Sequence, residues 1–126
     1  MMSQNKRPVF INLFQIKLPV AGVMSIAHRV AGVLMFIAIP FSLYVLELSL
    51  QSPQGFARAT EIVQSNWLMP LYLLLLWSLF HHLLAGIRYL LLDIDVGVEK
   101  PLYRQTAITV LVAAPLVVLL ILAVAS

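Results

Sequence analysis

The stretch from Leu68 to Leu92 constrains this chain most, because it is an almost unbroken apolar run of roughly 25 residues, long enough for a membrane helix. A helix rises about 1.5 Å per residue, so a run of this length crosses the ~30 Å hydrocarbon core of a bilayer with some tilt. The stretch therefore predicts a transmembrane helix.

Two further apolar runs, at about Gly22–Leu48 and Thr106–Ala125, are also long enough to span a bilayer. The chain of 126 residues is 62% hydrophobic and only 10% charged, which leaves too few charges to cover the surface of a water-soluble domain. Strands of a membrane barrel would instead show alternation over about ten residues. We predict an all-α membrane protein, a single transmembrane domain over residues 1–126 with three spans at approximately 22–48, 68–92 and 106–125.

The segments between the spans are short and more polar. Residues 1–20 form a basic, proline-interrupted segment that we expect to lie along the membrane surface. Residues 51–66 carry a helical apolar stripe that leads to Trp67, which predicts a short interfacial helix, although a polar linker with an accidental stripe would look the same. Residues 93–105 are predicted to form a polar loop.

The distribution of cations predicts the orientation of the spans. With the N-terminus inside, seven of the eight Lys and Arg residues lie on the inner side, and only Arg58 lies outside. The seven are Lys6, Arg7, Lys17, Arg29, Arg88, Lys100 and Arg104. The positive-inside rule therefore predicts a cytoplasmic N-terminus and an outer C-terminus. Because these cations flank apolar spans and form no patch, the net charge of +3 does not indicate nucleic acid binding.

The second span carries polar residues at helical spacing. His82, Gly86, Tyr89 and Asp93 follow at i, i+4, i+7 and i+11 and share one helix face. The glycine one turn from the histidine leaves room for a flat ligand. A neutral imidazole inside a membrane can be a metal ligand, or it can simply hydrogen-bond a neighbouring helix, and the residues alone leave both readings open.

The neighbouring His81 points about 100° away from His82, so the two cannot both be axial ligands of one iron. We expect His81 to be a packing or hydrogen-bonding residue. The chain has no cysteine, which excludes thiolate zinc sites and iron–sulfur ligation by this chain.

Near the start of the first span, Ser25, His28 and Arg29 occupy i, i+3 and i+4 and can donate hydrogen bonds to a common acceptor. In the alternative reading, Arg29 extends to lipid headgroups and Ser25 bonds back to its own helix.

Two motifs, in this order, resemble the signatures of the cytochrome b-type membrane anchor, the larger of the two anchor polypeptides, of bacterial succinate dehydrogenase. The first consists of Arg7-Pro8, Leu13, Val20 and Ser25-Ile26-Ala27-His28-Arg29, and the second of His82, Gly86-Ile87-Arg88 and Asp93. The sequence departs from these signatures at four positions. Ala31 stands where Ser or Thr is usual, Tyr89 where His or Phe is usual, Leu92 where an aromatic residue or Met is usual, and Asp95 where a small residue is usual. The resemblance covers essentially the whole chain.

The resemblance implies roles for individual residues. It makes His82 an axial ligand of the iron of heme b, and it places Ser25 and Arg29 at a ubiquinone site. It also implies a heme propionate or pocket role for His28, Arg29, Gly86 and Tyr89. The chain would have no catalytic residue of its own and would be a non-succinate-binding subunit of the enzyme.

The resemblance also implies partners, namely a second small membrane-anchor subunit and the soluble iron–sulfur and flavoprotein subunits. We expect His82 to lie roughly 15 Å above the cytoplasmic end of its helix and His28 to lie at the membrane boundary. At such different depths the two could not ligate one heme, so the small anchor would supply the second ligand. The complex would pass electrons from succinate to ubiquinone.

Two other functions stay open from the residues. A quinol:fumarate reductase would use the same kind of anchor and run the electrons in the opposite direction. A non-catalytic helical membrane scaffold would use the polar residues only for helix association, and a small transporter would need an acidic residue deep in a span, whereas Glu47 and Asp93 are terminal. We expect a bacterial cytoplasmic (inner) membrane location, because neither a cleavable signal peptide nor a transit peptide is evident.

Overall fold

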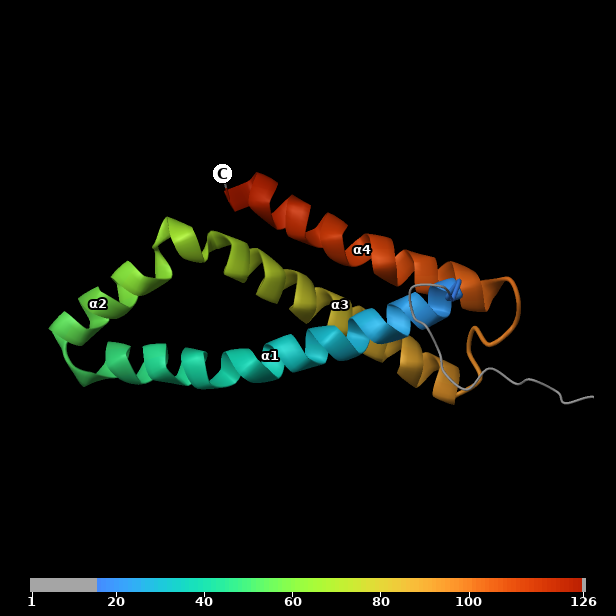
Figure 1. Cartoon of the computed structure of the whole chain (residues 1–126), viewed down its shortest axis with the longest axis horizontal. Helices are drawn as coiled ribbons and strands as arrows, with labels where there is room; N and C mark the ends of the chain where they lie inside the picture. The colour runs from blue at the N-terminus through green and yellow to red at the C-terminus, as the bar shows by residue number, and fades with distance from the viewer. Residues whose placement is uncertain (1–15, 126) are drawn as a thin grey trace, which may run out of the picture.

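The computed structural model describes residues 16–125, all of whose regular elements are helices (Figure 1). These are α1 (Val20–Gln51), α2 (Pro53–Val63), the short 3-10 helix η1 (Asn66–Leu68), α3 (Met69–Asp93) and α4 (Leu102–Ala125). Three helical stretches are long and apolar enough to cross a membrane, namely Val20–Gln51, Asn66–Asp93 and Leu102–Val124. The predicted all-α class with three membrane-spanning helices is confirmed. The surface segment predicted for residues 1–20 lies mostly outside the described residues.

The helix α4 begins earlier than the sequence predicts. Residues 102–105 belong to its first turn, where the backbone N–H of Tyr103 donates to the carbonyl of Glu99 at 2.9 Å and that of Arg104 to Pro101 at 3.0 Å. Pro101 suits a position just before a helix because it has no N–H to satisfy. The predicted loop over residues 93–105 was therefore too long at its C-terminal end.

The helix α2 turns the chain between α1 and α3, so a helix rather than a plain linker follows the first span (Figure 1). The hydroxyl of Ser52 accepts a hydrogen bond from the backbone N–H of Gly55 at 3.0 Å and caps the helix, with Pro53 in its first turn. A side chain at position 55 would collide with the carbonyl oxygen of Leu48, so this tight corner requires glycine.

The helix α3 ends in a Schellman-type turn. The backbone N–H of Val96 donates to Leu91 at 2.9 Å and that of Asp95 to Leu92 at 3.0 Å. Asp95 adopts a positive φ of 62°, in the left-handed region that short polar residues tolerate. This geometry accommodates Asp95, which departs from the signature that the sequence resembles.

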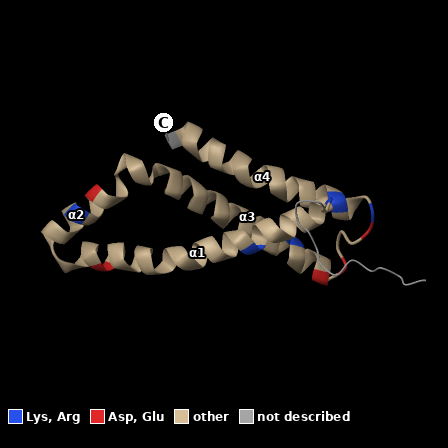
Figure 2. Cartoon of the chain, in the orientation of Figure 1, with Lys and Arg blue, Asp and Glu red and all other residues tan. Residues whose placement is uncertain are grey.

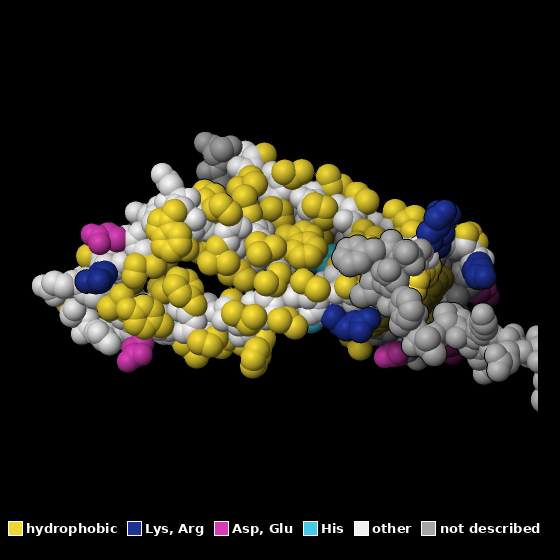
Figure 3. All heavy atoms as spheres, viewed as in Figure 1, with side chains coloured by type: hydrophobic (Ala, Val, Ile, Leu, Met, Phe, Trp, Pro, Cys, Tyr) yellow, Lys and Arg dark blue, Asp and Glu magenta, His cyan; other side chains and the backbone are white. Residues whose placement is uncertain are grey.

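The bundle packs through small side chains, with α3 in contact with both α1 and α4. Ala31, Ala85, Ala107 and Ala114 are fully buried, and Met24, near the start of α1, packs with Ala85 and Ala107. In a bilayer, helices associate by close van der Waals approach rather than by exclusion of water, and small residues allow that approach. Large apolar side chains cover the outside along the length of the bundle (Figure 3).

Most charged residues lie toward the two ends of the bundle, while Arg29 and Arg88 lie within α1 and α3 (Figure 2). Arg58 and Glu61 lie on α2 at one end, and Lys100 and Arg104 lie at the other end, beside the loop that joins α3 to α4. The long apolar middle between the two ends matches the dimensions of a membrane-spanning bundle.

Candidate functional site

Polar residues of α3 form two separate stripes. Ser78, His81 and Arg88 share the fully buried face with Ala85, whereas His82 lies on the adjoining half-buried face. The predicted separation of the two adjacent histidines is thus present in the structure, where His81 is completely buried and His82 is half-buried.

His82 is held by α1 through a backbone hydrogen bond. Its Nδ1 lies 3.1 Å from the carbonyl oxygen of His28, and the two imidazole rings stack with centroids 4.1 Å apart and an interplanar angle of 15°. Because a carbonyl oxygen only accepts, Nδ1 must carry the proton, which leaves the lone pair on Nε2. Donation of one ring nitrogen to a carbonyl, with the other free to bind, is the usual arrangement of a metal-binding histidine.

Gly32 on α1 leaves the space that allows the His82 ring to lie against the α1 backbone. A Cβ atom at Gly32 would lie 2.9 Å from Cε1 and 3.2 Å from Nδ1 of His82, closer than side chains tolerate. Gly32 was not predicted as a site residue, although its i+4 spacing from His28 places both residues on one helix face.

The rest of the His82 face is open or aromatic. A Cβ at Gly86 would meet nothing within 4 Å, as predicted from its spacing to His82. The ring of Tyr89 meets the ring of His28 edge to face, with centroids 5.3 Å apart. The structure thus brings together four predicted site residues from two helices, namely His28, His82, Gly86 and Tyr89.

The predicted difference in depth between His28 and His82 is wrong. Their rings are in direct contact, so they lie at the same level of the bundle. The prediction placed His28 at the membrane boundary, but α1 begins at Val20, and eight residues of helix carry His28 about 12 Å along the axis. His28 is therefore inside the bundle rather than at its edge.

Ser25 and Arg29 lie one turn apart on α1, with Arg29 directly after His28 in the sequence. The guanidinium group of Arg29 donates to the Ser25 carbonyl oxygen at 3.4 Å and to its hydroxyl at 3.5 Å. Both distances are at the long limit for hydrogen bonds, and Arg29 is exposed, so its donors can turn to another acceptor at little cost.

His81 is completely buried, with its ring stacked on that of Trp77 at a centroid distance of 5.2 Å. Neither of its ring nitrogens makes a hydrogen bond of normal geometry to another described residue, although the backbone of Met24 lies close enough to act on the ring. His81 is thus a packing residue in this structure, and nothing brings it to the open face on which His82 lies.

Arg88 joins α3 to α4, a role that was not predicted from the sequence. Its side chain is 4% exposed and donates to the hydroxyl of Thr106 and to the carbonyl oxygen of Tyr103, each at 2.9 Å. The guanidinium carbon also lies 4.6 Å from the centroid of the Tyr103 ring, a cation–π distance. Arg88 therefore fixes the first turn of α4 against the polar end of α3.

Three long apolar helices, with a histidine pair between two of them, define a multi-pass helical membrane protein. Residues 3–122 match the family described as the succinate dehydrogenase/fumarate reductase transmembrane subunit, and the chain belongs to this family.

Curated relatives carry the name succinate dehydrogenase cytochrome b556 subunit. The protein from Coxiella burnetii is 30% identical over 116 residues, which cover 91% of this chain and 93% of the relative. The protein from Paracoccus denitrificans is 34% identical over 99 residues, which cover 78% and 75%, and that from Rickettsia felis is 30% identical over 117 residues, which cover 93% and 91%. The chain is a succinate dehydrogenase cytochrome b membrane anchor, as the resemblance predicted.

Proposed function

We propose that this chain is the large anchor subunit of a succinate:ubiquinone oxidoreductase, and that His82 is an axial ligand of its heme b. The observation that carries the proposal is the hydrogen bond from His82 Nδ1 to the His28 carbonyl, which leaves Nε2 as the ligating atom. The curated relatives are named for a cytochrome b556, which agrees with a heme-binding histidine.

The residues around His82 fit a heme. Gly86 leaves open space one turn away on the same face, and the rings of His28 and Tyr89 border it from α1 and α3. We assign His28, Arg29 and Tyr89 to the propionates or the pocket wall, because imidazole, guanidinium and phenol groups can donate hydrogen bonds to carboxylates. When bound, heme b supplies a centre that takes up and releases one electron at a time.

The second axial ligand would come from another polypeptide. His81 is buried on a different face, and His28 stacks face to face on His82, so neither can approach an iron from the side opposite His82 in this arrangement. The sequence-based argument for a partner relied on different depths of His28 and His82, which the structure does not show. The stacked orientation of the two rings still implies that the second heme ligand comes from a partner subunit. A second small membrane-anchor subunit would supply this ligand.

Ser25 and Arg29 would bind the quinone head. Their donors lie together on one face of α1, and a guanidinium group stabilises the negative charge that develops on quinone oxygens during reduction. The soluble iron–sulfur and flavoprotein subunits would dock at this end of the bundle, on the cytoplasmic side, with the C-terminus of the chain outside the bacterial inner membrane.

Succinate oxidation is the direction we favour over fumarate reduction. The family description covers both enzymes, whereas the three curated relatives are named for succinate dehydrogenase. A non-catalytic scaffold would give no heme absorption and no quinone reduction.

The decisive experiment combines a reduced-minus-oxidised spectrum of the purified complex with an assay of succinate-dependent quinone reduction. We expect a b-type heme spectrum and quinone reduction that is driven by succinate. A complex without heme, or with heme that quinol reduces while succinate oxidation is absent, would contradict the proposal.

Gly32→Ala is expected to reduce heme retention by roughly tenfold to a hundredfold, the range seen when support of a metal ligand is lost. The added methyl group would press on the His82 ring at 2.9 Å and break its hydrogen bond to the His28 carbonyl. Heme content per complex and the heme midpoint potential are the measurements.

Gly22→Ala is the matched control for this substitution. Its Cβ would meet only Pro19 at 3.5 Å, an ordinary contact, so the same change in α1 should leave heme content and potential unaltered. If both substitutions lowered heme content equally, the effect would come from a general change in α1 and not from pressure on the His82 ring.

A further inference from the structure

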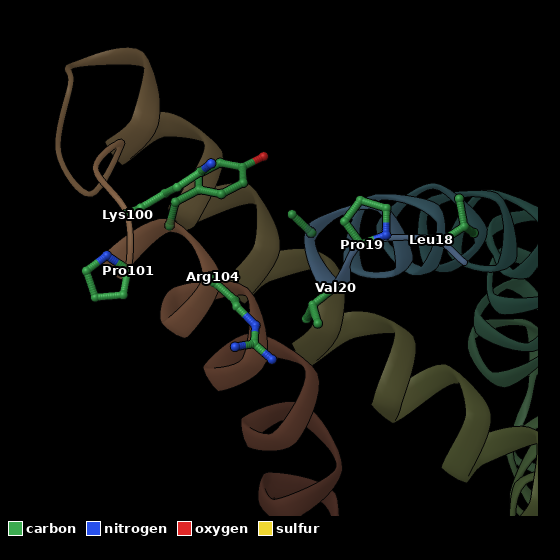
Figure 4. A pocket seen from close by; sticks show the side chains of 8 residues that line it. Leu18, Pro19, Val20, Lys100, Pro101 and Arg104 are labelled. Atoms are coloured by element: carbon green, nitrogen blue, oxygen red, sulfur yellow. The ribbon is translucent and has the colours of Figure 1, made fainter. Parts of the chain in front are cut away.

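A cavity of about 570 Å³ lies between the start of α1 and the beginning of α4, and His82 is not among the residues that line it (Figure 4). Leu18, Pro19, Val20 and Ala21 line it from α1 and the residues before it, and Lys100, Pro101, Tyr103 and Arg104 line it from the opposite side. The volume falls in the roughly 300–1,000 Å³ range of ligand sites.

The charged residues in the wall of this cavity are all cations. Lys100 and Arg104 form no side-chain hydrogen bond or ion pair with another described residue. Asp95 and Glu99 belong to the same loop, but neither lines the cavity. The lining of the cavity therefore offers positive charge, and no negative charge, to an anion.

The opposite wall of the cavity is apolar and partly rigid. Leu18, Val20 and Ala21 have apolar side chains. Pro19 faces Pro101 across the cavity, and the ring of each proline fixes its backbone φ angle (Figure 4). Leu18 and Tyr103 are each 39% exposed, so the cavity opens at the side of the bundle. It lies where the apolar span of α4 meets the polar loop, which is the level of lipid headgroups.

We infer that this cavity binds an anionic phospholipid, with its phosphate on Lys100 and Arg104 and the upper part of an acyl chain against Leu18 and Val20. A free anion would gain nothing from the apolar wall, and a zwitterionic lipid would gain little from two unpaired cations. Basic pockets between transmembrane helices are known to suit acidic headgroups. The inference does not depend on the heme or quinone assignments.

The test uses the full chain purified in its membrane complex. Phosphatidylglycerol and phosphatidylcholine with identical acyl chains are titrated separately, and bound lipid is counted by native mass spectrometry. We expect phosphatidylglycerol to bind at least tenfold more tightly, and inorganic phosphate to leave it in place. Equal binding of both lipids, or displacement by inorganic phosphate at millimolar concentration, would overturn the lipid site.

The double substitution Lys100→Gln, Arg104→Gln should weaken phosphatidylglycerol binding by roughly fivefold for each cation removed. Arg58→Gln removes an exposed cation on α2, at the other end of the bundle, and should change nothing. Unchanged lipid binding in the double variant, or equal loss in Arg58→Gln, would refute the site.

Leu18→Asp gives an independent test that keeps both cations. It places a negative charge in the apolar wall outside any helix, so it should repel the phosphate and weaken phosphatidylglycerol binding while the heme spectrum stays normal. Loss of a soluble subunit from these variants, with lipid retained, would assign the cavity to a protein contact instead and would also refute the inference.

Discussion

His82→Ala is expected to abolish or shift the heme b spectrum, with heme content falling by more than about tenfold, because the substitution removes an axial ligand outright. Any heme that remains should change its spectral form, since water or another side chain would take the vacant position. The measurements are the reduced-minus-oxidised spectrum and the heme content per complex.

The adjacent histidine provides the control for this prediction. His81→Leu replaces a completely buried ring, stacked on that of Trp77, by an apolar side chain. The spectrum should therefore stay largely intact. Loss of heme in His81→Leu, with His82→Ala unaffected, would exchange the roles of the two residues.

The membrane spans and the two faces of α3 could be predicted from the sequence because each is a property of a single helix and needs no knowledge of its neighbours. Apolar run length gives the spans, and the 100° turn between neighbouring residues separates His81 from His82. The same periodicity places Gly86 one turn from His82, and the structure shows open space there.

Contacts between helices could not be predicted in this way. The stacking of His28 on His82, the close approach at Gly32 and the bonds from Arg88 to α4 all depend on how the helices cross. A count of residues from a membrane boundary assumes that the boundary is known, and that assumption misplaced His28. Depth in a bundle is set by packing against neighbours.

The departures from the family signatures became interpretable only with the backbone in view. Asp95 is tolerated because it can adopt the left-handed conformation that ends α3. Ala31, which replaces the usual hydroxyl residue, is completely buried in the helix packing, where a methyl group needs no hydrogen-bond partner.

Arg29→Ala should slow quinone reduction by roughly tenfold to a hundredfold, while succinate oxidation with an artificial soluble acceptor stays near normal. The estimate follows from a charge-assisted hydrogen bond, worth about 1.5–3 kcal/mol, and from tenfold in rate per 1.36 kcal/mol. Among the described residues, the hydrogen bonds of Arg29 go to Ser25 on its own helix, at 3.4–3.5 Å, so its removal should leave the bundle intact.

Arg29→Lys separates the role of charge from that of geometry. A lysine keeps the positive charge but lacks the planar fork of donors, so it should restore quinone reduction only in part. Arg58→Ala, on the far side of the bundle, is the matched control and should leave both activities unchanged.

Both activities must be measured on one assembled preparation, because equal loss of the two would indicate failed assembly. Normal quinone reduction in Arg29→Ala would instead make Arg29 an interfacial residue that extends to lipid headgroups, since its donors would then have no part in binding the quinone.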